Sequence, residues 1–136
     1  MNGGPRLFSI LRQGQTLIAS IHTALDDSQL ERFQQDLVER IGGDRARGVI
    51  IDVAALDVLD SFGARTLRTI GEMARLRGAL TVVVGIQPDV AFAMVSLGMA
   101  TDTLITALDL EEGLEYHDHR IPQRSVARAN GHAERR

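Results

Sequence analysis

Residues 48–64, GVIIDVAALDVLDSFGA, contain in order an apolar run, an acidic loop and the beginning of a helix. The run at residues 49–53 is rich in β-branched side chains and has the length of a strand buried on both faces of a sheet. In residues 62–77 the apolar side chains recur near helical spacing, and Ser61 stands where the N-cap of that helix is expected. The segment therefore predicts a strand that leads, through an acidic loop, to a serine hydroxyl at the positive end of a helix dipole.

Two strands and a helix are predicted before this segment. Residues 7–11 and 16–21 are short apolar runs on either side of a turn at Gly14, a pattern typical of a β-hairpin. The Asp26-Asp27 pair can cap a helix, because the apolar side chains that follow are spaced at i, i+3, i+7, i+8 and i+11. We expect the Gly42-Gly43 pair to end that helix.

Two further strand and helix pairs are predicted after it. Residues 79–84, ALTVVV, have the composition of a second buried strand, and Pro88 suits the first turn of a short helix that Gly98 ends. Residues 104–106 form a weak last strand. The final helix is expected to open at Asp109, with Glu112 three residues later as in a capping box, and to run to about Tyr116.

This order predicts an α/β fold: a β-hairpin start, then alternating β/α units that form a mostly parallel mixed sheet covered by helices. Functional crevices in such sheets lie at the carboxyl ends of the strands. The loops at residues 54–61 and 85–88 both emerge there.

Composition limits the classes of protein to consider. A chain of 136 residues with 44% hydrophobic content is expected to form one globular domain. No run of 18 apolar residues occurs and the N-terminal residues lack a signal-peptide pattern, so we expect a cytoplasmic protein without a membrane span. The sequence has no cysteine, and all fifteen basic residues are arginine. Thiolate chemistry, Walker-type phosphate loops and lysine Schiff bases are therefore excluded.

Charge divides the chain into an acidic body and a basic tail. Residues 1–119 hold ten Arg and seventeen Asp or Glu, whereas residues 120–136 hold five Arg and one Glu. An acidic body with few aromatic residues argues against nucleic acid as a partner. We expect a domain over residues 1–116 and a disordered basic tail over residues 117–136, because the tail has almost no apolar content.

Enzyme motifs are weak or absent. Ser61 lacks the flanking glycines of a nucleophile elbow, and a serine triad would have to recruit His22 as its base. His117 and His119 bracket an aspartate, but no further ligand stands at a defined spacing for a metal site. No G-x-G-x-x-G fingerprint or phosphate loop occurs, so no cofactor is predicted.

A phospho-acceptor receiver domain is the nearest competing class. The Asp26-Asp27 pair and Asp52 stand after and at the end of predicted strands, as receiver aspartates do. Receivers also need a lysine late in the sheet, however, and this chain has none. Without further information, the residue type and position of Ser61 indicate only a helix cap.

The run from residue 7 to about residue 114 resembles the STAS domain, the anti-sigma factor antagonist family. The segments that carry the resemblance are ALDVLDSFGARTL (55–67), GALTVVVGIQPDVAFAMVSLGM (78–99) and ITALDLEEGLE (105–115). They are most similar to the small single-domain antagonists of the bacterial stressosome. The resemblance implies that Ser61 is the phosphorylation site and that Asp60 is its acidic neighbour. Many relatives carry a second phosphorylatable threonine where this chain has Ala93, so the resemblance does not extend to a second site.

The resemblance also implies partners and a mechanism. Relatives bind a serine/threonine kinase of the histidine-kinase-like ATPase class, release it when phosphorylated, and co-assemble with longer paralogues that end in STAS domains. A homo-oligomer is expected as well, with no catalytic residue, metal, nucleic acid or membrane. The surface expected to bind the partner comprises Asp57, Leu59, Asp60, Phe62, Gln87 and Pro88. The alternative is a simple anti-anti-sigma factor that binds an anti-sigma kinase without a large assembly. A hydrolase that uses Ser61 and His22 is a third hypothesis.

Overall fold

The structure, a computed structural model, describes residues 6–98 and 104–121 and contains one five-stranded sheet in the order β1-β2-β3-β4-β5. The strands are β1 (Phe8–Gln13), β2 (Thr16–Ile21), β3 (Gly48–Asp52), β4 (Leu80–Val84) and β5 (Ile105–Ala107). The helices are α1 (Asp27–Asp44), α2 (Ser61–Leu76), α3 (Pro88–Ser96) and α4 (Leu110–Arg120). The predicted fold class is confirmed: β1 and β2 are antiparallel, and each later neighbour is parallel.

The hairpin is tighter than expected from the apolar runs. The strand β1 continues to Gln13, which pairs with Thr16, so only Gly14 and Gln15 connect the two strands. Gly14 has a φ of 64°, a left-handed conformation that favours glycine in two-residue hairpin turns. The turn lies where it was predicted, but β1 is shifted: it includes Arg12 and Gln13 and begins at Phe8, one residue later than predicted.

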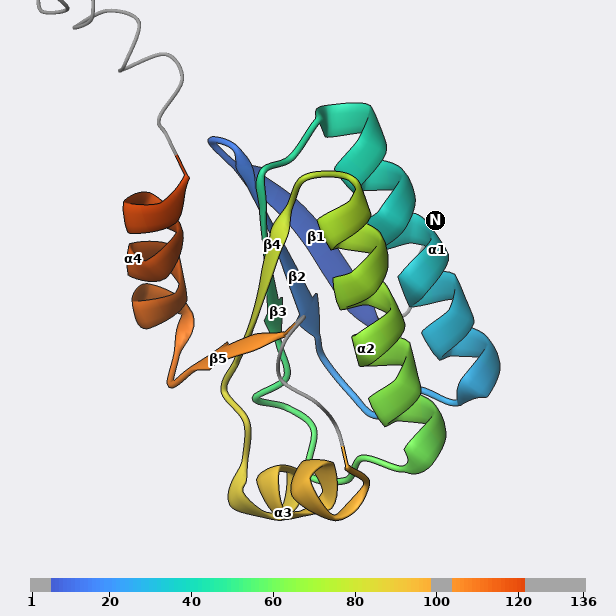
Figure 1. Cartoon of the computed structure of the whole chain (residues 1–136). Helices are drawn as coiled ribbons and strands as arrows, with labels where there is room; N and C mark the ends of the chain where they lie inside the picture. The colour runs from blue at the N-terminus through green and yellow to red at the C-terminus, as the bar shows by residue number, and fades with distance from the viewer. Residues whose placement is uncertain (1–5, 99–103, 122–136) are drawn as a thin grey trace, which may run out of the picture.

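Helices cover the two faces of the sheet unequally (Figure 1). The helices α1 and α2 pack side by side on one face, and α4 packs on the other against β3, β4 and β5. The short α3 lies at the carboxyl edge of the sheet, beyond the end of β4. This arrangement leaves the loops at the carboxyl edge next to α3 and the first turn of α2.

The core has a large and a small part, one on each face. Alternate residues of β2 and β3, such as Leu17, Val49 and Ile51, are fully buried beneath α1 and α2 and pack around Phe33. On the other face, the buried side chains of Ile50, Val82 and Val84 contact apolar residues of β5 and α4. Because β3 and β4 are covered on both faces, they lack the polar and apolar alternation of a one-sided sheet.

The ends of two helices differ from the prediction. The helix α1 does not end at the Gly42-Gly43 pair but continues to Asp44, and Arg45 caps it with a φ of 53°. The helix α4 does not end near Tyr116 but continues to Arg120, so the expected boundary at residue 116 falls inside a helix. The rest of the predicted tail, residues 122–136, lies outside the described residues.

Candidate functional site

The helix α2 begins at the acidic loop, but its N-cap is Asp60 and not Ser61. Asp60 has an extended backbone, and its carboxylate accepts a hydrogen bond of 2.8 Å from the Gly63 N–H. Its carbonyl accepts the Ala64 N–H at 2.9 Å. The prediction placed the cap one residue too late, because serine and aspartate are both good caps and stand next to each other. Ser61 is the first residue of the helix and is exposed.

The first turn of α2 keeps two backbone donors unused. The described hydrogen bonds of Asp60 occupy the third and fourth N–H groups of the helix. The first two, on Ser61 and Phe62, donate to no other described residue. Such unused donors, together with the helix dipole, make a helix N-terminus favourable for an anion. The serine oxygen is thus attached directly to a turn that can accommodate a phosphate.

The loop between β3 and α2 is folded on itself. The Asp52 carboxylate accepts the Ala54 N–H at 2.9 Å, and the Leu56 N–H donates to the Val53 carbonyl at 2.9 Å. Leu56 is buried, and Leu59 lies so close to Gly63 that a Cβ on that glycine would be 2.9 Å from a Leu59 methyl group. These contacts fix the loop on the core and turn its polar residues outward.

A second loop, after β4, holds the first one in place. The Gln87 side-chain amide donates to the Ala54 carbonyl at 2.6 Å, and the Val53 N–H donates to the Val84 carbonyl at 3.0 Å. Gly85 has a φ of 77°, and a Cβ at this position would be 2.9 Å from the Ala54 Cβ. Glycine is required here both for the backbone conformation and for the close approach of the two loops.

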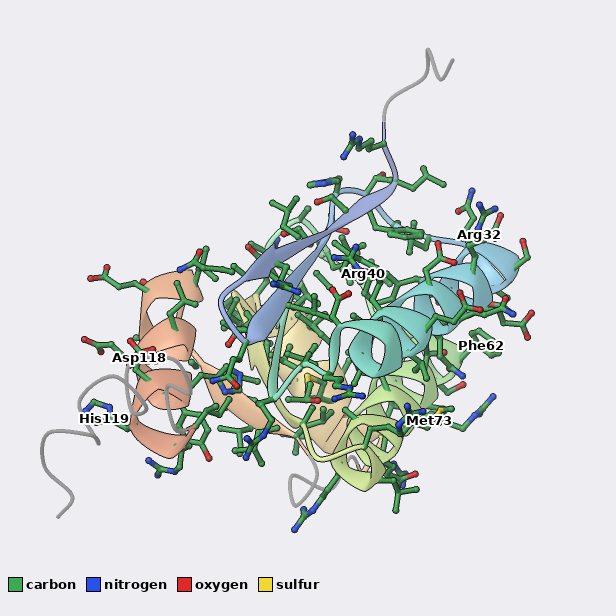
Figure 2. The ribbon with its side chains drawn as sticks, turned by 90° about the horizontal axis from the view of Figure 1, so that it is seen from above. Arg32, Arg40, Phe62, Met73, Asp118 and His119 are labelled. Atoms are coloured by element: carbon green, nitrogen blue, oxygen red, sulfur yellow. The ribbon has the colours of Figure 1, made fainter. Side chains whose placement is uncertain are left out.

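The structure brings the expected partner-binding residues to the carboxyl edge of the sheet but gives them different surroundings. Asp57 and Pro88 are exposed. Leu59 packs partly on the core, whereas Phe62, labelled in Figure 2, is half-buried. Asp60 and Gln87 hold backbone groups, as described above. Beside these residues, a small hollow of about 110 Å³ is lined by Leu56, Val58, Leu59 and residues of β2 and α1.

Arg65 is a neighbour of Ser61 that the sequence analysis missed. It stands four residues after the serine on α2, so both side chains project from the same face of the helix. Its guanidinium lies 5.8 Å from the centre of the Phe62 ring. The i, i+4 spacing within the predicted helix was the signal that could have identified it.

The residues considered for a serine triad or a receiver site, His22, Asp26 and Asp52, form hydrogen bonds with other groups. The His22 Nε2 lies 3.1 Å from the Ser9 hydroxyl on the neighbouring β1, and no described contact links it to Ser61. Asp26 forms a capping box with Gln29 of α1. Asp26 and Asp52 thus hold local backbone turns, which accounts for their positions after strands without any phospho-acceptor chemistry.

The two histidines of the H-D-H segment lie on different sides of α4. The His117 side chain is buried against the sheet, whereas Asp118 and His119 point away from it (Figure 2). His117 occupies the space left by Gly48, where a Cβ would be 3.0 Å from the imidazole ring. The two rings therefore cannot bind the same metal ion. Across residues 6–98 and 104–121, no three acidic or histidine side chains are grouped as metal ligands.

The family model of the STAS domain matches residues 8–112 of the chain. The chain belongs to the STAS domain family. A solved structure of RsbS from Moorella thermoacetica, in a form with one serine replaced by glutamate, is 32% identical, with a TM-score of 0.76 over 83% of this chain and 96% of that one. A chain of a structure described as the molecular architecture of the stressosome is 29% identical, with a TM-score of 0.69 over 82% of this chain and 97% of that one.

A curated relative and more distant structures complete the comparison. RsbRA of Bacillus subtilis, named an RsbT co-antagonist protein, is 29% identical over 91 residues, which are 67% of this chain and 33% of that protein. The chain thus spans about a third of the length of this relative. The anti-sigma factor antagonist SpoIIAA shares the fold at 14% identity and a TM-score of 0.65. The chain is therefore a STAS domain similar to RsbS and to a chain of the stressosome structure, and none of its described helices is long and apolar enough to cross a membrane.

Proposed function

We propose that this protein is a non-enzymatic regulator that sequesters a serine kinase in a stressosome-type complex and releases it when Ser61 is phosphorylated. The observation that carries the proposal is the position of Ser61. It is exposed as the first residue of α2, where its own N–H and that of Phe62 are unused, and it follows a loop that is held by the neighbouring loop. The similarity to an RsbS form in which serine is replaced by glutamate supports it, because glutamate adds negative charge as a phosphate does.

The switch acts by changing the charge of an interface. A phosphate adds about 1.5 to 2 negative charges, which the helix N-terminus and Arg65 can accommodate without unfolding the domain. Asp57 and Asp60 already make the surrounding surface acidic, so the phosphate concentrates like charge there. A kinase surface that is acidic or apolar at this point is repelled. Ser61 needs no catalytic base for this role, because the kinase supplies the chemistry.

The partners follow from the relatives. The kinase is of the histidine-kinase-like ATPase class, and the second partner is a longer paralogue that ends in a STAS domain, as the similarity to RsbRA suggests. The preference for a stressosome component over a simple anti-anti-sigma factor rests on identities of 32% and 29% to RsbS and a stressosome chain, against 14% to SpoIIAA. Co-elution with the paralogue in a particle much larger than a dimer would distinguish the two.

Binding of a recombinant kinase of this class from the same organism tests the switch. Ser61→Ala should bind the kinase with and without ATP, whereas the wild type should release it when ATP is present. Ser61→Asp should bind more weakly, since aspartate is tolerated in a first helical turn and changes only the charge. Ser28, an exposed serine in the first turn of α1 whose hydroxyl donates to the Asp26 carboxylate at 3.1 Å, provides control positions. Ser28→Ala and Ser28→Asp should behave as the wild type in calorimetry.

Two results would contradict the proposal. Phosphate mapped to a residue other than Ser61 after incubation with kinase and ATP is the first. Equal affinity of the wild type, Ser61→Ala and Ser61→Asp for the kinase, with and without ATP, is the second.

A further inference from the structure

The connections between strands and helices separate charge by sign. The connections at the carboxyl edge, residues 22–26, 53–60, 85–87 and 108–109, contain four aspartates and no arginine. The described connections at the amino edge, residues 14–15, 45–47 and 77–79, contain three arginines and no acid. Arg6, which precedes β1, is an exception near the acidic edge. Figure 1 shows the two sets of connections at opposite ends of the molecule.

The three arginines surround a hollow at the amino edge. Arg45, Arg47 and Arg77 line a space of about 320 Å³ together with the apolar residues Ile41 and Ala46. The Arg77 guanidinium lies against Gly42 near the end of α1, where a Cβ on the glycine would be 2.6 Å from one of its nitrogens. Within the described residues, none of the three side chains has an ion pair or hydrogen bond.

The hollow remains positive after the neighbouring charges are counted. The C-termini of α1 and α2 meet there, and each contributes about half a negative charge. Three guanidinium groups therefore leave an excess of about two positive charges. Asp44, the acid at the end of α1, does not change this result, because its carboxylate is bound by Arg40 at 3.1 Å.

The loop at the other end of the molecule has the complementary composition. Asp57 is exposed and makes no described hydrogen bond or ion pair, and next to it Val58 has 69% of its surface exposed. The Asp57 carboxylate can pair with the arginines that line the hollow, and the Val58 side chain can contact its apolar lining residues. The loop is also fixed by the buried Leu56, so little conformational entropy is lost when it binds.

From this complementarity we infer that the amino-edge hollow binds the Asp57-Val58 tip of a second copy of this chain. The contact joins different surfaces of the two copies, so a bound pair still has one free hollow and one free tip. Repetition of such a heterologous contact produces a ring or a filament. Because the tip lies in the loop that leads to Ser61, a copy bound there also covers the surface proposed for the kinase.

Changing the charge on each side of the contact tests the inference without a kinase. The double variant Arg47→Ala, Arg77→Ala removes the positive charge of the hollow and keeps the tip, whereas Asp57→Arg removes the tip and keeps the hollow. The matched controls are Arg32→Glu and Glu39→Arg, which make the same changes of charge on exposed positions of α1. Molar mass is measured by sedimentation at low and high salt, and circular dichroism checks that each variant is folded.

The inference predicts a distinctive result for a mixture of the two variants. The wild type and both controls should form assemblies whose association constant falls at least tenfold between about 50 mM and 500 mM salt, because exposed charges are screened. Each hollow or tip variant alone should be monomeric. Mixed in equal amounts they should form a dimer and nothing larger, because only one intact hollow and one intact tip can meet.

Three results would overturn the inference. A wild type that stays monomeric at low salt is one. Folded hollow or tip variants that associate as the wild type does are another, because another surface would then be responsible. A mixture that remains monomeric, or that forms assemblies larger than a dimer, is the third.

Discussion

At the scale of single residues, the acid before the serine supports the helix and the serine does not. Asp60→Ala should lower the free energy of unfolding by about 1 kcal/mol, because it removes the cap that accepts the Gly63 N–H. Ser61→Ala should change it by less than about 0.5 kcal/mol, since Ser61 makes no described side-chain hydrogen bond. Urea unfolding measures both, with Asp57→Ala as a control for charge. Equal losses for Asp60→Ala and Ser61→Ala would show that the serine shares the capping role.

His117 is the residue whose ionisation should affect stability. Burial lowers its pKa from the usual 6.5, although the hydrogen bond of 3.1 Å to the Val49 carbonyl and the charge of Asp118 partly raise it. The unfolded chain therefore takes up a proton at a higher pH than the folded one, so the free energy of unfolding should fall as the pH drops below 6.5. The loss ends below the folded-state pKa.

His117→Gln removes the titration and can keep a donor to the same carbonyl. Between pH 7 and pH 5 its unfolding free energy should fall less than that of the wild type, measured by urea unfolding at each pH. Parallel pH curves for the two proteins would mean that the pKa of His117 is the same in the folded and the unfolded chain, and would contradict this prediction.

At the scale of elements, the last turn of α4 is part of the core and not of a tail. Ile121 is 4% exposed, and both it and His117 pack on Gly48 at the start of β3. The predicted start of a disordered tail at residue 117 therefore falls inside a packed helix. Ending the chain at Tyr116 should cost at least about 2 kcal/mol, the usual loss for a large buried apolar side chain.

Ending the chain at Ile121 is the matched control for that deletion. It keeps every described contact of α4 and should leave the melting temperature almost unchanged. If both truncations melt like the full chain, the contacts of His117 and Ile121 with Gly48 add no stability.

At the scale of the whole molecule, the parallel β/α units place the start of α1, α2, α3 and α4 at one edge of the sheet. Three of the four N-caps are aspartates, and these form hydrogen bonds with the first turns of their helices. Part of the acidic charge at this edge is thus balanced by helix dipoles. Asp57 is outside these caps, so its carboxylate remains available to a partner.

The sequence alone determined the order of the elements, the hairpin turn and the family, because these depend on local periodicity, turn residues and motifs along the chain. It could not distinguish Asp60 from Ser61 as the cap, since both residues have the required chemistry and only the backbone conformation selects between them. The sequence also did not predict the last turn of α4, because residues 117–120 are polar. His117 packs there against Gly48, which is 69 residues earlier in the chain, and local sequence does not indicate such a contact. Contacts between distant segments, including the one between Gln87 and Ala54 that fixes the serine loop, were decided only when the sheet brought those segments together.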